Sequence, residues 1–249
     1  MREFLLFRLH GLLASWGEIA VGERRGSWSR PSKSAVLGLV AAALGIERHE
    51  GERLGALAAG YGFAVRVDSP GVSLRDYHTV QTAREANIRK LRKTSARPLT
   101  RRRELSVDDP ETILSQRDYY TDALYTAALW TRENPPVPLG EIRDALRRPR
   151  FVLYLGRKSC PPSLPLVPEV VAAEHLLAAL AAYRPPTLPG LDLAQLLNPR
   201  GDPMLLAWEG AVVPEEVARR LHVERRRDAP GDRQRWHFAE RDEQVAILP

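Results

Sequence analysis

The sequence predicts an α+β fold in which helices pack against one face of a sheet. Segments with strand-like and helix-like patterns alternate along the first part of the chain, and one strongly cationic stretch interrupts them. Their order is strand, helix, strand, cationic stretch, strand, strand, helix, strand, which suits a ferredoxin-like or RNA-recognition-type sheet. Proline then becomes dense, which marks a different C-terminal region.

The first elements are defined by apolar spacing and by capping residues. Phe4–Leu9 is apolar at nearly every position, as expected for a central strand. A glycine-punctuated loop is predicted from His10 to Pro31. A helix follows, with Ser32 or Ser34 as its N-cap and Gly45 as its left-handed C-cap.

Five further elements complete the predicted sheet and its helices. The patterns predict strands at Phe63–Val67, Leu114–Thr121, Tyr125–Thr131 and Phe151–Leu155, with a tight turn between the middle two. Pro138–Leu146 is expected to form a short amphipathic helix, because its apolar residues recur at helical spacing.

The proline-rich C-terminal region is predicted to be a smaller unit that folds against the first. A helix is expected over Glu174–Tyr183, and strands are expected over Met204–Trp208 and Val245–Leu248. We therefore predict an RNA-recognition-type domain over residues 1–168 and a smaller subdomain over residues 169–249.

The composition indicates a soluble protein of the cytoplasm. Of the 249 residues, 44% are apolar, which is ample for a buried core. No run of about 18 apolar residues occurs, so no transmembrane helix is expected, and we predict no membrane partner. The N-terminus does not fit a signal peptide, because Arg8 interrupts its short apolar stretch and no cleavage site follows. Cys160 is the single cysteine, which excludes an internal disulfide and fits a reducing compartment.

The cationic stretch points to nucleic acid. From Arg84 to Arg103 it holds nine Lys and Arg residues and one acid, Glu85, so it carries +8 in a chain whose net charge is +6. This concentration is typical of a surface that binds a phosphate backbone, whereas the alternative is a solvated charge run without a partner. Because strand-like sequence bounds the stretch, we predict an inserted arm at about residues 81–112. Its candidate RNA contacts are Arg84, Arg89, Lys90, Arg92, Lys93, Arg101 and Arg102.

The motifs of common enzymes and metal sites are missing. No histidine lies at metal-ligand spacing from Cys160 or from another histidine, and no serine lies in a nucleophile elbow. Gly60-Tyr61-Gly62 is only a fragment of a phosphate-binding glycine loop. We therefore predict no catalytic residue, no metal, no cofactor and no small-molecule substrate.

The loop that precedes the first helix alternates aromatic and basic residues. Such a loop, leading into a helix N-terminus, is suited to bind an anion, and a tryptophan in it could stack on an unpaired base. The alternative is that Trp16 and Trp28 anchor the loop in the core. The candidate RNA contacts of this loop are Trp16, Arg24, Arg25, Trp28, Arg30, Lys33 and Ser34.

Two further segments provide candidate contacts. In the first, Arg75, Tyr77 and His78 stand close together. A metal-free ribonuclease needs a general acid and a general base, which Tyr77 and His78 could supply. On a strand, however, these two side chains point to opposite faces, which favours nucleotide contact over catalysis.

In the second segment, a predicted glycine turn precedes Arg157 and Lys158, which are suited to clamp phosphates. The alternative is that Gly156 merely permits the turn and that the two cations are solvated. Cys160 has no companion base in the sequence, so we interpret it as a packing residue.

Five segments, taken in order, resemble a known family. They are Leu9–Gly17, Arg30–Leu39, Leu74–Val80, Gln116–Ala123 and Tyr154–Pro161. Together they are similar to the CasD family, a CRISPR-associated subunit of the type I-E Cascade complex.

The resemblance implies a RAMP-type RNA-recognition domain with an inserted basic, β-rich thumb. It implies a subunit that grips the 5′ handle of the CRISPR RNA and caps the backbone of the complex. Such a subunit contacts the large subunit and the backbone subunit, and it meets target DNA only indirectly. In type I-E systems another subunit, CasE, cuts the precursor RNA, so the resemblance implies no enzymatic activity. The alternative is a metal-independent endoribonuclease that processes CRISPR repeat RNA, as the corresponding subunit does in type I-C systems. A weaker alternative is a protein that binds double-stranded DNA.

Overall fold

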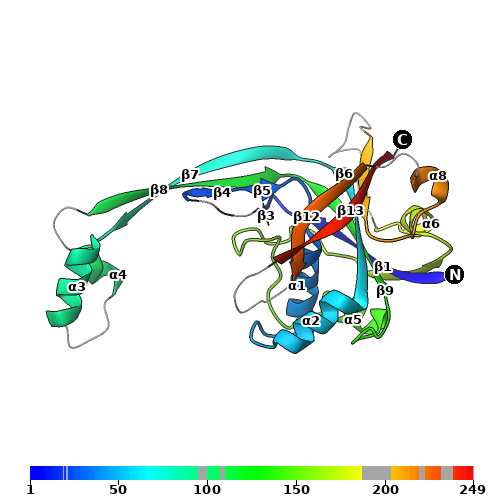
Figure 1. The fold of residues 1–249 in the computed structure, drawn as a ribbon, viewed down its shortest axis with the longest axis horizontal. Helices are drawn as coiled ribbons and strands as arrows, with labels where there is room; N and C mark the ends of the chain where they lie inside the picture. The colour runs from blue at the N-terminus through cyan, green and yellow to red at the C-terminus, as the bar shows by residue number, and fades with distance from the viewer. Residues whose placement is uncertain are drawn as a thin grey trace.

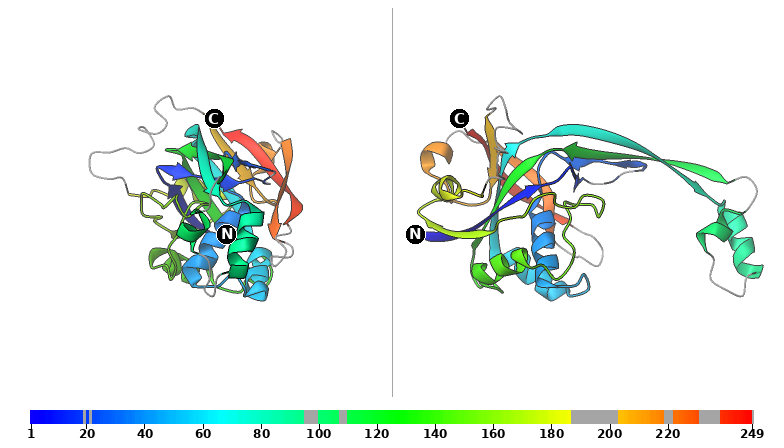
Figure 2. Two further views of the ribbon diagram at one scale, coloured as in Figure 1. Left: turned by 90° about the vertical axis from the view of Figure 1, so that its left-hand side faces the viewer. Right: turned by 180° about the vertical axis from the view of Figure 1, so that it is seen from behind.

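The computed structural model describes residues 1–18, 20, 22–94, 100–106, 110–186, 203–218, 222–230 and 238–248. Figure 1 shows a body built on one sheet and a long two-stranded arm that projects from it. The two further views in Figure 2 agree that the arm leaves the body and ends in a small helical tip. The N-terminus lies on the side of the body away from the arm.

The body contains a seven-stranded sheet in which every neighbouring pair is antiparallel. Its spatial order is β10, β1, β9, β6, β11, β13, β12. These strands are β1 (Arg2–His10), β6 (Tyr61–Ser69), β9 (Leu124–Thr131), β10 (Glu169–Ala173), β11 (Met204–Trp208), β12 (His222–Pro230) and β13 (Phe238–Leu248).

Helices cover both faces of this sheet. The helices are α1 (Lys33–Leu44), α2 (Gly51–Gly60) and α5 (Leu139–Arg147) on one face, and α6 (Leu176–Ala182) on the other. Because strand side chains alternate, Leu5 and Phe7 of β1 pack toward α1, α2 and α5, whereas Phe4 and Leu6 pack toward α6. The short helix α8 (Glu215–Ala218) lies beside the α6 face, where Val217 joins the same cluster. Burial on both faces explains why β1 and β9 are apolar along most of their length.

The arm is an antiparallel ladder of β7 (Val72–Thr82) and β8 (Glu111–Thr121). Its tip carries α3 (Glu85–Thr94) and α4 (Arg101–Glu104), as Figure 1 shows. Near the body, β8 also pairs with β2 (Leu13–Ala14) and with β4 (Arg24–Arg25). Two further short strands, β3 (Trp16–Gly17) and β5 (Ser27–Trp28), pair with each other in the same loop region.

Most elements predicted from local patterns are confirmed. The side chain of Ser32 caps α1 by accepting a hydrogen bond from the amide of Ala35, and Gly45 ends the helix at φ +73°. The predicted strand Met204–Trp208 is β11, with the same bounds. The strands predicted at Phe4–Leu9 and Phe63–Val67 lie within β1 and β6. The predicted helices become α5 and α6, and Val245–Leu248 lies within β13.

Phe151–Leu155, which was predicted to be a strand, is irregular. The amides of Arg150 and Phe151 donate to the carbonyls of Ala43 and Ala42 at the end of α1, at 3.0 and 3.1 Å. The segment therefore packs beside a helix end, and its first amides bond to helix carbonyls instead of to a neighbouring strand.

The arm also differs from the prediction. The strands at Leu114–Thr121 and Tyr125–Thr131 exist, but they lie in different sheets, because Asp122 at φ +54° turns the chain from β8 into β9. The paired part of the arm begins at Val72, before the expected residue 81, and its most basic part is helical instead of β-rich.

The predicted division at residues 168 and 169 passes through the large sheet. Strands β10 to β13 lie beyond this boundary, yet they extend the sheet formed by β1, β9 and β6. The two segments thus share one sheet, and the division into a larger and a smaller unit stays a prediction.

A buried network of charges joins the start of α1 to the C-terminal hairpin. Glu243 is fully buried, and its carboxylate accepts hydrogen bonds from Arg30 and Arg241 at 2.6 Å. Arg226 adds a contact at 3.4 Å. Burial opposes the charge on Glu243, but Arg241, Arg226 and Arg30 outweigh it and lower the pKa of this carboxyl. Beside it, Lys33 donates to Glu209 at 3.0 Å.

We expect Glu243→Gln to lower the free energy of unfolding by about 3–5 kcal/mol, because it leaves buried guanidinium groups without their shared carboxylate. Equilibrium unfolding in urea measures this change. The matched control is Glu240→Gln, an exposed position on the same strand. Equal stability of the two variants would contradict the role assigned to the network.

Candidate nucleic-acid interface

The tip of the arm gathers exposed cations on two short helices. No residue of α3 or α4 is buried. Among the described residues of the tip, Glu85 pairs with Arg89 at 2.6 Å and Glu104 pairs with Arg101 at 3.4 Å. The cations of the tip that form no ion pair with another described residue include Lys90, Arg92, Lys93 and Arg102. The tip is therefore a positively charged surface far from the body (Figure 1).

The ladder of β7 and β8 determines which side chains share a face of the arm. Arg75 lies opposite Asp118 and Tyr77 lies opposite Gln116, so these side chains lie on one face. His78 lies on the other face, opposite Ser115, and its Nδ1 atom is 2.5 Å from the carboxylate of Asp76. The prediction that Tyr77 and His78 point to opposite faces is confirmed, and 65% of Tyr77 is exposed.

Asp118 is the point where three arginines meet at the base of the arm. Its carboxylate accepts hydrogen bonds from Arg75 Nε at 2.7 Å and from Arg24 Nη2 at 3.2 Å. Hydrogen bonding by Arg75 lowers the pKa of this carboxyl below its usual range, and Arg24 acts in the same direction. Its main-chain carbonyl accepts from Arg157 Nη1 at 3.3 Å and from Ser15 Oγ at 3.0 Å.

The predicted glycine turn is confirmed, and it brings Arg157 to this position. Gly156 adopts φ +85°, and a Cβ atom there would collide with the carbonyl oxygen of Ser15. The Arg157 guanidinium lies 4.7 Å from the centre of the Tyr119 ring and donates to the carbonyl of Arg25 at 2.9 Å. Lys158 is exposed beside it.

Three predicted contact residues are buried and cannot meet RNA in this structure. Trp16 is only 2% exposed and packs edge-on against Tyr125, so the core-anchor alternative is correct for this residue. Arg30 and Lys33 are bound within the buried charge network described above. Their positive charges are compensated internally and do not reach the surface.

The other predicted residues of the loop remain accessible. Trp28 is 38% exposed, and the guanidinium of Arg226 lies 5.0 Å from the centre of its ring. Arg25 is exposed and donates to the carbonyl of Gly22. Ser34 is half-buried, and its hydroxyl lies 3.1 Å from that of Ser32.

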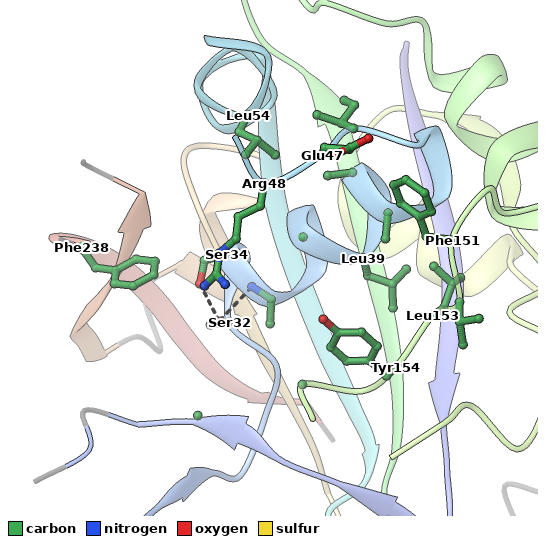
Figure 3. Close-up of a pocket in the computed structure, with 18 residues that line it drawn as sticks. Ser32, Ser34, Leu39, Glu47, Arg48, Leu54, Phe151, Leu153, Tyr154 and Phe238 are labelled. Atoms are coloured by element: carbon green, nitrogen blue, oxygen red, sulfur yellow. Dashed lines mark hydrogen bonds between the residues drawn. The ribbon is translucent and has the colours of Figure 1, made fainter. Parts of the chain in front are cut away.

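Ser34 also lines a cavity of about 800 Å³ between α1, the irregular segment 151–156 and the start of β13. Figure 3 shows Phe151, Tyr154 and Phe238 around this cavity, with Arg48 beside Ser34. The walls are mainly apolar, and Ser32 and Ser34 at the N-terminus of α1 are among the lining residues.

Two classes of site find no support in the described residues. No group of three His, Cys, Asp or Glu side chains there is arranged to hold a metal ion. No helix of the described chain is long and apolar enough to cross a membrane.

Asp118 was not among the residues predicted to contribute to the site. It lies in one of the segments that carry the family resemblance, but nothing local distinguishes it from other aspartates. Its contacts depend on the register that sets it opposite Arg75, which is known only from the fold.

Comparison with known proteins then defines the class of protein. The chain is similar to one in a solved CRISPR RNA-guided surveillance complex, with a TM-score of 0.63, 25% identity, and coverage of 98% of this chain and 90% of that chain. It is also similar to a crystal structure of a Cas protein, with a TM-score of 0.61, 28% identity, and coverage of 99% and 95%. The fold is thus that of CRISPR-associated proteins.

The family follows from the sequence. Residues 4–243 match the profile described as CRISPR-associated protein (Cas_Cas5). The chain is 35% identical over 193 residues to the CRISPR system Cascade subunit CasD of Escherichia coli, which covers 74% of this chain and 79% of the relative. The chain belongs to the Cas5 family, and the predicted resemblance to CasD is confirmed.

The two tryptophans of the loop are expected to respond differently to truncation. Trp16→Ala should lower the free energy of unfolding by about 3–5 kcal/mol, because it empties a large buried site. Trp28→Ala, at an exposed position, should change it by about 1 kcal/mol or less. Thermal or urea unfolding of both variants measures the difference, and similar losses would show that Trp16 is not a core anchor.

Proposed function

We propose that this protein is a CasD-type subunit of a type I-E Cascade complex that grips the 5′ handle of the CRISPR RNA and caps the backbone of the complex. It binds RNA and does not cut it. The observation that carries the proposal is the exposed cationic tip of the arm, in a chain that belongs to the Cas5 family.

The charge distribution supports RNA as the ligand. Phosphates are contacted chiefly by Lys and Arg, and the exposed cations of α3 and α4 outnumber the two acids of the tip. Single-stranded RNA also exposes its bases, and the exposed ring of Tyr77 provides a stacking surface worth about 1–3 kcal/mol per base. The proposed contact surface therefore runs along the Arg75 and Tyr77 face of the arm to its tip.

The two faces of the arm argue against an endoribonuclease. A general acid and a general base that act on one scissile phosphate must reach it together. Tyr77 and His78 point in opposite directions from β7, and Asp76 lies beside His78 on its face. Binding without cleavage is the function that fits this arrangement.

The fold supports a RAMP-type, ferredoxin-like domain. Along the chain the elements run β1, α1, β6, β9, α5, β10, with the arm inserted between β6 and β9. These four strands are neighbours in the order β10, β1, β9, β6, as a split β-α-β unit requires. In RNA-recognition domains, bases stack on the open face of the sheet. Here α6 packs on that face against Phe4, Leu6 and Trp208, so we place RNA binding on the arm.

The proposed partners follow from the family. The E. coli relative is a subunit of Cascade. We propose that this chain likewise assembles with the large subunit and the backbone subunit in the cytoplasm, and that it meets target DNA only through the complex.

Charge reversal at the tip tests the proposal. Replacing Arg89, Lys90, Arg92 and Lys93 with Glu should weaken binding of the CRISPR RNA by more than about tenfold, because four phosphate contacts are lost. The slope of log K against log salt should also fall in magnitude by about 3. Binding is measured by fluorescence anisotropy in EDTA, with the RNA examined on a gel afterwards.

The matched control reverses four exposed arginines of the body, Arg2, Arg53, Arg148 and Arg225, which gives the same change in net charge. This control should retain most of the affinity. Equal loss in both variants would contradict the role of the arm, and specific cleavage of the RNA by the wild-type protein in EDTA would contradict the binding-only function.

A further inference from the structure

We infer that Asp118 is a positioning residue that holds Arg24 and Arg75 as one phosphate-binding site at the base of the arm. The inference rests on the proposed RNA-binding function and assigns one part of it to a defined site. Arg24 comes from β4, Arg75 from β7 and Asp118 from β8, so the site forms only where these three strands meet.

The two guanidinium groups bind Asp118 in the same way. Arg75 donates to its carboxylate through Nε at 2.7 Å and through Nη2 at 3.4 Å. Arg24 donates through Nε at 3.4 Å and through Nη2 at 3.2 Å. Each arginine thus binds Asp118 through the Nε and Nη2 edge of its guanidinium group. No described residue accepts a hydrogen bond from the Nη1 group of either arginine.

The Nη1 groups of Arg24 and Arg75 are accessible, and the site carries a net positive charge. The side chains of Arg24 and Arg75 are 61% and 46% exposed, whereas that of Asp118 is only 10% exposed. One carboxylate beneath two guanidinium groups leaves a positive charge at the surface. An arginine fork matches the geometry of a phosphate, which can accept from both arginines at once.

The backbone of Asp118 is held in place by hydrogen bonds from two other segments. Its main-chain carbonyl accepts from Ser15 Oγ and from Arg157 Nη1, so its backbone is tied to two further segments. The two arginine side chains are largely exposed, so these ion pairs also place positive charge at the surface, beyond what they contribute to holding the strands together. Asp118 orients the two forks at that surface.

The site is continuous with the proposed RNA path. Tyr77 lies two residues beyond Arg75 on the same face of β7, which is about 7 Å along the strand. A nucleotide whose phosphate sits on Arg24 and Arg75 can therefore bring a base to the ring of Tyr77. His78 and Asp76 lie on the opposite face and take no part in this site.

The variant Asp118→Asn distinguishes a positioning role from a purely electrostatic one, because the two predict opposite changes in the affinity for RNA. Removing a negative charge near a polyanion strengthens binding if only charge matters. If Asp118 orients the forks, binding weakens instead, by about 5- to 10-fold, which corresponds to the net loss of one ordinary hydrogen bond. The magnitude of the salt slope should also fall by about 0.7, as expected when one phosphate contact on a single strand is lost.

The control is Asp76→Asn on the opposite face, which changes the net charge equally and should leave the affinity unchanged or slightly higher. Arg75→Lys is a second test that does not depend on the folding of the Asp118 variant. It keeps the charge but removes the fork, and it should also weaken binding about 5- to 10-fold. Folding of each full-length variant is checked by circular dichroism and thermal unfolding.

The probe is a fluorescein-labelled single-stranded RNA that carries the CRISPR 5′ handle. If wild-type protein does not bind it, the proposed function and this inference both fail. If wild type binds but Asp118→Asn binds equally or more tightly, or Arg75→Lys binds equally, the inference alone is wrong. Weaker binding by both variants, with a reduced salt slope and an unaffected Asp76→Asn control, supports it.

Discussion

The attachment of β8 to the body is the constraint on which the rest of the structure depends. A two-stranded ribbon buries no core of its own and is marginally stable in isolation. At its base, however, β8 pairs with β2 and β4 in addition to β7, and Asp118 binds side chains from two of these strands. The arm is thus held at one end, and its other end projects freely into solvent (Figure 1).

In this arrangement the body and the arm of the chain have different roles. The body covers both faces of its sheet with helices and compensates the charges of Arg30 and Lys33 internally. The described residues of α3 and α4 at the tip of the arm are not buried, so their cations remain available to an external phosphate backbone. Concentrating positive charge on a projecting element also extends the reach of its field toward a polyanion. Stability and the proposed RNA binding therefore depend on different residues, and substitutions can separate them.

Local signals predicted those features whose causes are local. Ser32 and Gly45 cap α1 through their own conformational preferences, and the alternation around Tyr77 and His78 follows from strand geometry. Features that depend on distant partners were not predictable. Arg30 and Lys33 resemble surface cations in sequence, but their acids Glu243 and Glu209 lie 213 and 176 positions away. Trp16 and Trp28 likewise differ only in what the fold places around them, and Asp118 acquires its role from the register of β7 and β8.

The central claim is that RNA meets the arm and not the sheet of the body. Ultraviolet crosslinking of the complex, purified by co-expression with its partner subunits and analysed by mass spectrometry, tests this most directly. We predict that peptides of this chain crosslinked to the CRISPR RNA come from β7, β8 and α3, with Tyr77 among the crosslinked residues. Crosslinks confined to α6 and the neighbouring strands β10 and β11 would contradict the account.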